Sequence, residues 1–417
     1  MAEVTVSEAQ GMYKRLYDPE VVDVRPRSAV GQRAIPFNKR KRLGESYQIP
    51  VAVKMPNGFT YAGSSGAAAT LNAARNMVIK QASATGYELD LREEITWKAI
   101  SQAVEDGEGA FGSLVQTVQG AMIGSSSNRL EATLLHGQRG YGTIESVADA
   151  GSSQVNVVIT AATWSNGLWW ACGQGSTWDA FTSTTKNNAT GVLVLQAITS
   201  STRTLKFDHS GTFSSEVAAG DVLYPQGAYD GTTHTDAPGL LTQCSNTTGT
   251  SLGLSATTYI NWGANTYTAT GPISHGMIED AVSRLRDRGA EGRLQVWLSN
   301  KRYSTVAMEV ASLRMVTDAS PMQKIGVKGI TIQSADVGDI EIINNPMMKD
   351  GEFLILPVEE CERVGSSDIT DKLPGLNKGE FFRYVQDKNT CEFGVYSDQA
   401  VICKRPNWSM VGTGLTD

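Results

Sequence analysis

The chain has 417 residues, of which 41% are hydrophobic and 19% are charged, and its formal net charge is −7. This length is typical of two or three domains, and the composition supports packed cores and argues against global disorder. A protein whose whole surface binds nucleic acid would be basic, so the net charge disfavours that class.

Cysteine usage and the N-terminus give no sign of secretion or of a membrane. The five cysteines are odd in number and no two have Cys-x-x-Cys spacing, which argues against a disulfide framework and a zinc site. We expect buried free thiols in a reducing cytoplasm. The sequence shows no signal peptide and no apolar run of about 20 residues, so we expect no membrane partner.

Residues 1–43 show no sustained periodic pattern, and Pro19, Pro26 and Pro36 limit any helix to the stretch around residues 7–16. Such an arm gains little from local contacts and loses conformational entropy when it becomes ordered. We therefore expect it to be ordered only where it lies across something else.

Residues 44–104 are predicted to leave a domain and return to it. Tyr47, Ile49, Val51 and Val53 share one face of a strand, and Pro56-Asn57-Gly58 suits a tight turn. The second leg of this extended hairpin begins either at Phe59 or nearer Tyr87. A two-stranded ribbon with an apolar face is marginal alone, so we expect a neighbouring molecule to cover it.

Residues 105–137 are predicted to form a long helix, over about 107–136. Acidic residues at 105–108 and Gly137 suit its two ends. Glycines at 112, 120 and 124 lower its helix propensity, so we expect packing to stabilise it. The expected packing residues recur at helical spacing: Phe111, Leu114, Val115, Val118, Met122, Leu130 and Leu134.

Residues 143–225 change in character and are predicted to form a small inserted β-domain. Short β-type runs, among them "QVNVVITAA", "GLWWACG", "GVLVLQAI" and "RTLKFD", are separated by turn residues, and only three Lys or Arg occur. Four tryptophans gather here: Trp164, Trp169, Trp170 and Trp178. They fit either the core of the β-domain, which we favour, or a platform that binds sugars.

The last part of the chain alternates helices and strands. After a loop-rich stretch, apolar residues from Ile273 to Leu285 predict a helix, "LQVWLSN" a buried strand, and residues 303–313 a second helix. "IEIINN" and "EFLILPV" predict further strands, and residues 380–407 a terminal antiparallel hairpin.

The order of these elements resembles the major capsid proteins of tailed bacteriophages, which share the Hong Kong 97-type shell fold. The resemblance is carried by the sequence of arm, long hairpin and glycine-punctuated helix ending in Leu134-Leu135-His136-Gly137, then the loop at Gly239-Leu240. The "VWLSN" strand between two helices and the closing "VYSDQAVICKRP" follow. It covers nearly the whole chain, with 143–225 as an insertion.

The resemblance implies an α+β capsid shell fold with defined regions: an N-terminal arm (1–43), an extended loop (44–104), a spine helix and part of a peripheral domain (105–142), the inserted β-domain (143–225), an axial domain (226–375) and closing strands of the peripheral domain (376–417). It also implies a non-enzymatic protein that assembles into hexamers and pentamers, forms an icosahedral head around double-stranded DNA and is made in the host bacterial cytoplasm. The expected partners are further copies of the chain, a separate scaffolding protein, a portal protein and, as a further option, a decoration or cement protein.

The candidate intersubunit residues lie in the arm, the ribbon and one acidic pair: Arg25, Arg27, Arg33, Lys39, Arg40, Lys41, Arg42, Tyr47, Ile49, Val51, Val53, Lys54, Phe59, Tyr61, Glu93 and Glu94. For the basic strip 38–42, we favour a contact between subunits over weak, non-specific contact with packaged DNA. Glu93 and Glu94 are adjacent on a strand and point to opposite faces, so they do not suit shared acid–base catalysis. We expect such acids to pair with arm arginines of a neighbour.

Catalytic and cofactor motifs are missing from the sequence. The four histidines, at positions 136, 209, 234 and 275, have no metal-ligand spacing, and we expect no metal and no cofactor. Neither a nucleophile elbow nor a phosphate-binding loop occurs. The alternative function is a phage tail or surface β-protein that binds glycans through the Trp-rich module.

Overall fold

The computed structural model describes residues 29–38, 46–66, 68–98, 114–151, 153–188, 191–209, 216–314, 330–334, 338–371, 383–385 and 387–417. The chain divides into two compact units. The described residues of the small unit lie within 90–126 and 369–396. The large unit comprises the described parts of 26–89, 127–368 and 397–417.

A mixed six-stranded sheet forms one core of the large unit. Its spatial order is β13-β21-β17-β14-β16-β15, and the pairs β13–β21 and β14–β16 are parallel. The bounds are β13 Asn265–Gly271, β14 Leu294–Leu298, β15 Ile330–Ser334, β16 Gly338–Asn344, β17 Glu352–Pro357 and β21 Met410–Leu415.

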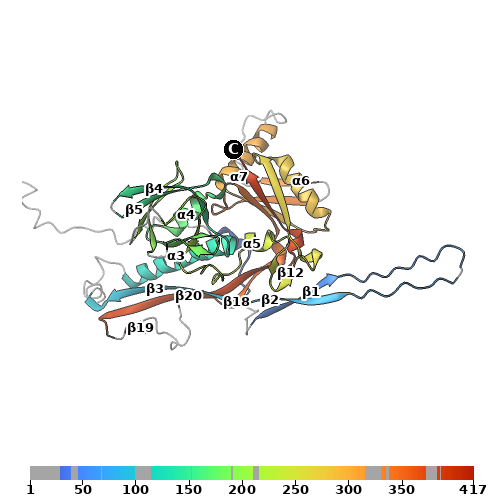
Figure 1. Ribbon diagram of the computed structural model, residues 1–417, viewed down its shortest axis with the longest axis horizontal. Coiled ribbons are helices and arrows are strands. Elements are labelled where there is room, and N and C mark those ends of the chain that lie inside the picture. The colour runs from blue at the N-terminus through green and yellow to red at the C-terminus, as the bar shows by residue number, and fades with distance from the viewer. Residues whose placement is uncertain are drawn as a thin grey trace, which may run out of the picture. The chain divides into compact units, whose positions relative to one another are not determined.

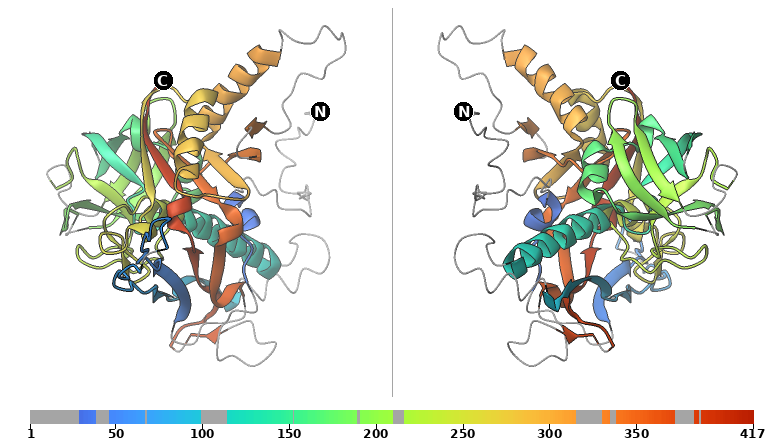
Figure 2. Two further views of the ribbon diagram at one scale, coloured as in Figure 1. Left: turned by 90° about the vertical axis from the view of Figure 1, so that its right-hand side faces the viewer. Right: turned by 90° about the vertical axis from the view of Figure 1, so that its left-hand side faces the viewer.

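Helices α6 (His275–Arg286) and α7 (Asn300–Arg314) pack against this sheet, and Figure 2 shows both helices beside its strands. Apolar residues at helical spacing on α6, such as Ala281 and Leu285, contact the core. All five residues of β14 are buried, which confirms the buried strand predicted from "LQVWLSN".

Strand β21 is a difference from the sequence-based assignment, which grouped the C-terminal residues with the peripheral domain. It pairs with both β13 and β17. Met410 and Leu415 are buried in the same core as α6. The burial of these side chains therefore places the chain's last strand in the six-stranded sheet.

A seven-stranded antiparallel sheet occupies residues 142–225. Strand β10 pairs with β4 on one side and with β6 on the other, so the sheet closes on itself. Closure leaves few unpaired edges. Its strands are β4 Gly142–Gly151, β5 Gln154–Ile159, β6 Thr177–Thr182, β7 Thr185–Lys186, β8 Leu193–Thr199, β9 Thr204–His209 and β10 Val222–Pro225.

The strand predicted from "GLWWACG" is wrong, because these residues lie in helix α4 (Asn166–Cys172). The Ser165 side chain accepts a hydrogen bond from the Leu168 amide and so caps the helix, and Gly173 ends it with a φ of 74°. Leu168 and Trp169 are buried on one helix face. Capping residues outweighed the β propensity of the two tryptophans.

The predicted long helix is observed as α3 (Leu114–His136), and residues 107–113 lie outside the described residues. From Leu130 to His136 every residue except Thr133 is buried. A helix enclosed on most sides is held by its surroundings. The glycines within α3, Gly120 and Gly124, lie before this buried stretch.

Residues 29–38 of the arm, which include α1 (Val30–Ala34), lie across other elements, as expected of an ordered arm segment. This segment docks on its own chain. The buried Glu131 carboxylate of α3 accepts hydrogen bonds from the amides of Gly31 and Gln32. A buried carboxylate requires donors, and α1 supplies them.

The ribbon consists of β1 (Tyr47–Lys54) and β2 (Val78–Ala84), which pair antiparallel. The predicted turn at Pro56-Asn57-Gly58 is wrong. The Asn57 amide donates to the carbonyl of Arg75 on the returning leg, so the chain has not yet reversed at residue 57. Phe59–Tyr61 form no strand. The strand of the second leg therefore begins at Val78, between the two positions considered.

In the small unit, β3 (Tyr87–Thr96) pairs with β20 (Thr390–Cys403), and these strands pack on the first part of α3. The core contains Ile95, Met122, Phe393 and Val395. Strand β20 also pairs with β19 (Arg383–Tyr384) in the predicted terminal hairpin, and β18 (Cys361–Thr370) joins this sheet.

The remaining short elements are η1 Ala161–Thr163, α5 Leu240–Cys244, β11 Thr250–Ser251, β12 Leu254–Ser255, η3 Ile260–Trp262, η4 Val358–Glu360 and η5 Pro406–Trp408. No helix in the part of the chain that the structure describes has the length and apolar character needed to cross a membrane.

Candidate interaction surfaces

The base of the β1–β2 ribbon is anchored in the large unit. Ile49 and Val53 of β1 are buried together with Ala82 and Ala84 of β2. They pack against residues distant in the sequence, among them Leu254, Trp262, Val364 and Ile402. The apolar face that we expected a neighbour to cover is thus covered by the chain itself.

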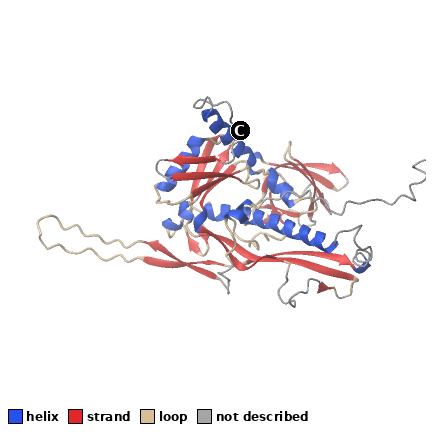
Figure 3. Cartoon of the chain, turned by 180° about the vertical axis from the view of Figure 1, so that it is seen from behind, coloured by secondary structure: helices blue, strands red, loops and turns tan. Residues whose placement is uncertain are grey.

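Beyond this base, the loop 55–77 extends from the ends of β1 and β2 (Figures 1 and 3). Its large apolar side chains are exposed, and Tyr61 reaches 94% exposure. The other exposed apolar side chains of the loop are Met55, Phe59, Leu71 and Met77. Several large apolar side chains exposed on one loop are typical of a surface that contacts another molecule.

Hydrogen bonds between its two legs give the loop a defined course. The Asn72 side chain donates to the Phe59 carbonyl over 2.7 Å, and the Asn72 amide donates to Thr60 Oγ1, also over 2.7 Å. The stretch 54–80 contains Lys54, Arg75 and Lys80 and no acidic residue. The loop therefore presents apolar side chains in a positively charged setting.

The other candidate intersubunit residues are scattered. Arg25, Arg27 and the strip Lys39, Arg40, Lys41 and Arg42 lie outside the described residues. Arg33, Lys54 and Phe59 are exposed, and Tyr47 and Val51 are half-buried against the ribbon base. Their contact with another subunit stays a prediction.

The acidic pair lies on β3 of the small unit, where Glu93 and Glu94 are both exposed. Glu94 Oε2 lies 3.3 Å from Lys388 Nζ of the same chain. Exposed ion pairs of this kind contribute little to stability.

The expected packing residues of α3 divide between the two units. Met122 is buried in the small unit with Val118 packed beside it, whereas Leu130 and Leu134 are buried in the large unit. Phe111 lies outside the described residues, and the side chains of Leu114 and Val115 are likewise not described.

Three of the four clustered tryptophans lie in the protein interior. Trp164, Trp169 and Trp178 are buried, and the ring centroids of Trp169 and Trp178 are 4.8 Å apart. Trp170 is 48% exposed, and its Nε1 donates to Ser200 Oγ. This arrangement is a packed core rather than a flat sugar-binding platform.

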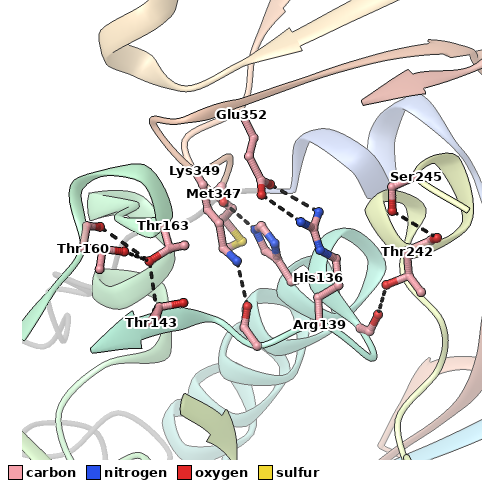
Figure 4. Close-up of polar contacts among 12 residues, drawn as sticks. His136, Arg139, Thr143, Thr160, Thr163, Thr242, Ser245, Met347, Lys349 and Glu352 are labelled. Atoms are coloured by element: carbon pink, nitrogen blue, oxygen red, sulfur yellow. Dashed lines mark hydrogen bonds and ion pairs between the residues drawn. The ribbon is translucent and has the colours of Figure 1, made fainter. Parts of the chain in front are cut away.

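The sequence did not reveal a buried polar cluster at the C-terminal end of α3, which Figure 4 shows. Arg139 donates to both oxygens of Glu352 over 2.8 and 3.3 Å. Lys349 Nζ donates to the Gly140 carbonyl over 2.7 Å, and His136 Nε2 donates to the Met347 carbonyl over 2.8 Å. These bonds join the end of α3 to the segment 347–352.

Burial sets the protonation of this cluster. It lowers the pKa of His136 well below the ordinary value of 6.5, and the neighbouring Lys349 charge adds to the effect. Burial also lowers the pKa of Lys349 to about 8. The cluster therefore combines a partly buried ion pair, Arg139–Glu352, with a neutral imidazole, and its bonds to backbone carbonyls suit a structural role.

Two glycine motifs that carried the resemblance meet beside this cluster. The Gly239 amide donates to the Gly137 carbonyl over 2.9 Å. A Cβ atom at Gly137 would lie 1.9 Å from the Ala237 carbonyl oxygen, so only glycine fits this crossing. The sequence contained both motifs but gave no sign that they touch.

The described residues contain no candidate metal site and no disulfide. Among them, no group of three or more His, Cys, Asp or Glu side chains could hold a metal ion. The five cysteines are free, and four of them are buried.

Replacing Trp169 by Ala should lower the free energy of unfolding by about 3–5 kcal/mol, because a fully buried indole leaves a cavity. Trp170→Ala is the matched control and should cost about 1 kcal/mol or less. Urea unfolding followed by far-ultraviolet circular dichroism measures both. Equal losses in the two variants would contradict the core assignment.

His136 should make the protein less stable in acid. The unfolded chain binds a proton at this residue below pH about 6.5 while the folded chain does not, so stability falls as the pH drops from 7 to 5, by up to about 1.4 kcal/mol per pH unit. The difference between urea midpoints at pH 7 and pH 5 should shrink in His136→Gln. It should remain in the control His275→Gln, and an unchanged difference in both variants would refute the assignment.

Comparison with known proteins bears on the fold. No family model and no curated protein matches the sequence. The structure is similar to a chain of the cyanophage A-1(L) capsid asymmetric unit, with a TM-score of 0.59 and 10% identity over 99% of this chain and 100% of that one. It is also similar to a capsid chain of a native GTA particle, with a TM-score of 0.50 and 10% identity over 99% and 98%. The chain thus has the mixed α+β fold of capsid proteins, as the resemblance predicted.

Proposed function

We propose that this protein is the repeating subunit of an icosahedral phage head. The observation that carries the proposal is the similarity to a cyanophage capsid chain along the whole length of both chains. Structural proteins of this kind act by assembly, and no enzymatic activity is proposed.

The loop 55–77 supplies a surface suited to such assembly. A loop that exposes Phe59, Tyr61 and Leu71 on an anchored ribbon cannot bury them within its own chain. Placing such side chains against a second copy removes them from water, which stabilises the contact by about 1.5–3 kcal/mol per side chain. A contact in which different surfaces of two copies meet generates rings, as hexamers and pentamers require.

The regions follow the resemblance. We assign the arm to 1–43, the extended loop to 44–104, the spine helix to α3, the inserted domain to 143–225, the axial domain to about 226–375 together with β21, and the peripheral domain to the remainder. The head would enclose double-stranded DNA and be made in the host cytoplasm. The proposed partners are a scaffolding protein, a portal protein and, as an option, a decoration protein.

The proposal is tested by negative-stain electron microscopy of the expressed protein, with and without a co-expressed candidate scaffolding protein. We expect closed shells or capsomer rings in at least one preparation. A protein that stays a stable monomer in both would refute the assignment.

The triple variant Phe59→Ser, Tyr61→Ser, Leu71→Ser should fold normally and assemble poorly. These side chains are exposed in the single chain, so folding loses little, whereas each intersubunit contact loses more than tenfold in affinity. Sedimentation and particle counts measure assembly, and circular dichroism measures folding. Ile260→Ser, which replaces an exposed apolar residue outside the loop, is the control. Normal assembly of the triple variant would exclude the loop as a contact.

A further inference from the structure

Residues 29–38, which we name the N-terminal clasp, bind at two places in the large unit. The first place is the middle of α3. Glu131, fully buried, accepts hydrogen bonds from the Gly31 amide over 2.5 Å and the Gln32 amide over 3.0 Å. The Gln32 side chain donates to the Ser127 carbonyl over 2.6 Å, and Ser127 Oγ donates back to it.

The second place is β18. Phe37 and Arg363 form a parallel β-bridge, and the Asn38 amide donates to the Arg363 carbonyl over 3.0 Å. The Arg363 guanidinium lies 5.9 Å from the centroid of the Phe37 ring. Arg363 is itself buried and bonded to Asp368. The clasp therefore links α3 to β18, two elements far apart in sequence.

The clasp is held by polar contacts more than by apolar burial. Only Gly31 and Ile35 of its residues are buried, while Arg33 and Pro36 are exposed. A segment with so little buried apolar area has a low free energy of local opening compared with a packed strand. Its docking should therefore depend strongly on Glu131.

The fit at Glu131 is close. A Cβ atom at Gly31 would lie 2.9 Å from Glu131 Oε1, so a larger residue would push the carboxylate away from the two amides. Burial raises the pKa of the Glu131 carboxyl, and the two amide hydrogen bonds act in the opposite direction. A carboxylate in this position is the acceptor that the clasp amides require.

We propose that residues 29–38 form a separable clasp, which joins α3 to β18 through Glu131 and Arg363 and opens as a unit while the rest of the large unit stays folded. While the clasp is closed, it restrains the two elements that it bridges. Its opening removes that restraint without breaking the six-stranded sheet. A role in rearrangements of an assembled shell rests on the proposed function, whereas the opening itself does not.

Hydrogen exchange and limited trypsin digestion of the full chain test the proposal. In the unsubstituted protein, the amides of residues 31–37 should exchange faster than those of β14, and trypsin should cut after Arg33 before it cuts the large-unit core. In Glu131→Gln, an NH₂ group replaces one carboxylate oxygen and faces a clasp amide. Because an NH₂ group donates and does not accept, one of the two hydrogen bonds to the clasp is lost. We expect exchange at 31–37 and cleavage after Arg33 to rise about tenfold to a hundredfold, with β14 unchanged.

Gly31→Ala should have the same local effect with Glu131 intact, and Glu359→Gln, which alters an exposed carboxylate, should have none. The proposal is overturned if residues 31–37 and β14 exchange at one common rate in the unsubstituted protein. It is also overturned if Glu131→Gln and Gly31→Ala speed exchange in β14 as much as at residues 31–37, or if neither variant changes cleavage after Arg33. Shell formation by the same variants is scored separately by electron microscopy. A protein that never assembles can therefore still confirm or refute the clasp.

Discussion

The buried second half of α3 is the constraint on which the large unit depends. A helix enclosed by protein must satisfy its end groups and its polar side chains from other segments, because water does not reach them. Three distant segments meet this need: the clasp at Glu131, the Gly239 loop at Gly137, and the segment 347–352 with its contacts to His136 and Arg139. Each contact draws in chain that lies about a hundred residues or more away.

Burying the polar cluster at the end of α3 costs desolvation free energy, and removing one of its partners would lower the stability of the fold. Removing Arg139 would leave the buried Glu352 charge without its partner, which is more damaging than never having had the pair. His136 is accommodated as a neutral ring, and Lys349 donates to a backbone carbonyl. These groups define one arrangement of the α3 terminus, which apolar packing alone would specify less sharply.

The base of the ribbon and the loop beyond it differ in burial. The base contributes Ile49 and Val53 to a core shared with Trp262 and Ile402, so the ribbon leaves the unit from a fixed position. The loop beyond it has no such cover and exposes its aromatic residues. A rigid base with an uncovered apolar loop suits a contact between copies better than a wholly flexible arm would, because less ordering entropy is lost on binding.

Local sequence determined much of the secondary structure. Periodic apolar residues identified α6 and α7, the predominantly apolar run of β14 identified a buried strand, and the order of elements pointed to the capsid fold. The tertiary structure decided what depends on distant partners. It decided that Gly31 meets Glu131, that Gly137 crosses Gly239, that β21 joins β13 and β17, and that β1 pairs with residues 78–84 rather than with Phe59–Tyr61. Those outcomes follow from contacts between residues far apart in the chain, about which local propensity and spacing carry no information.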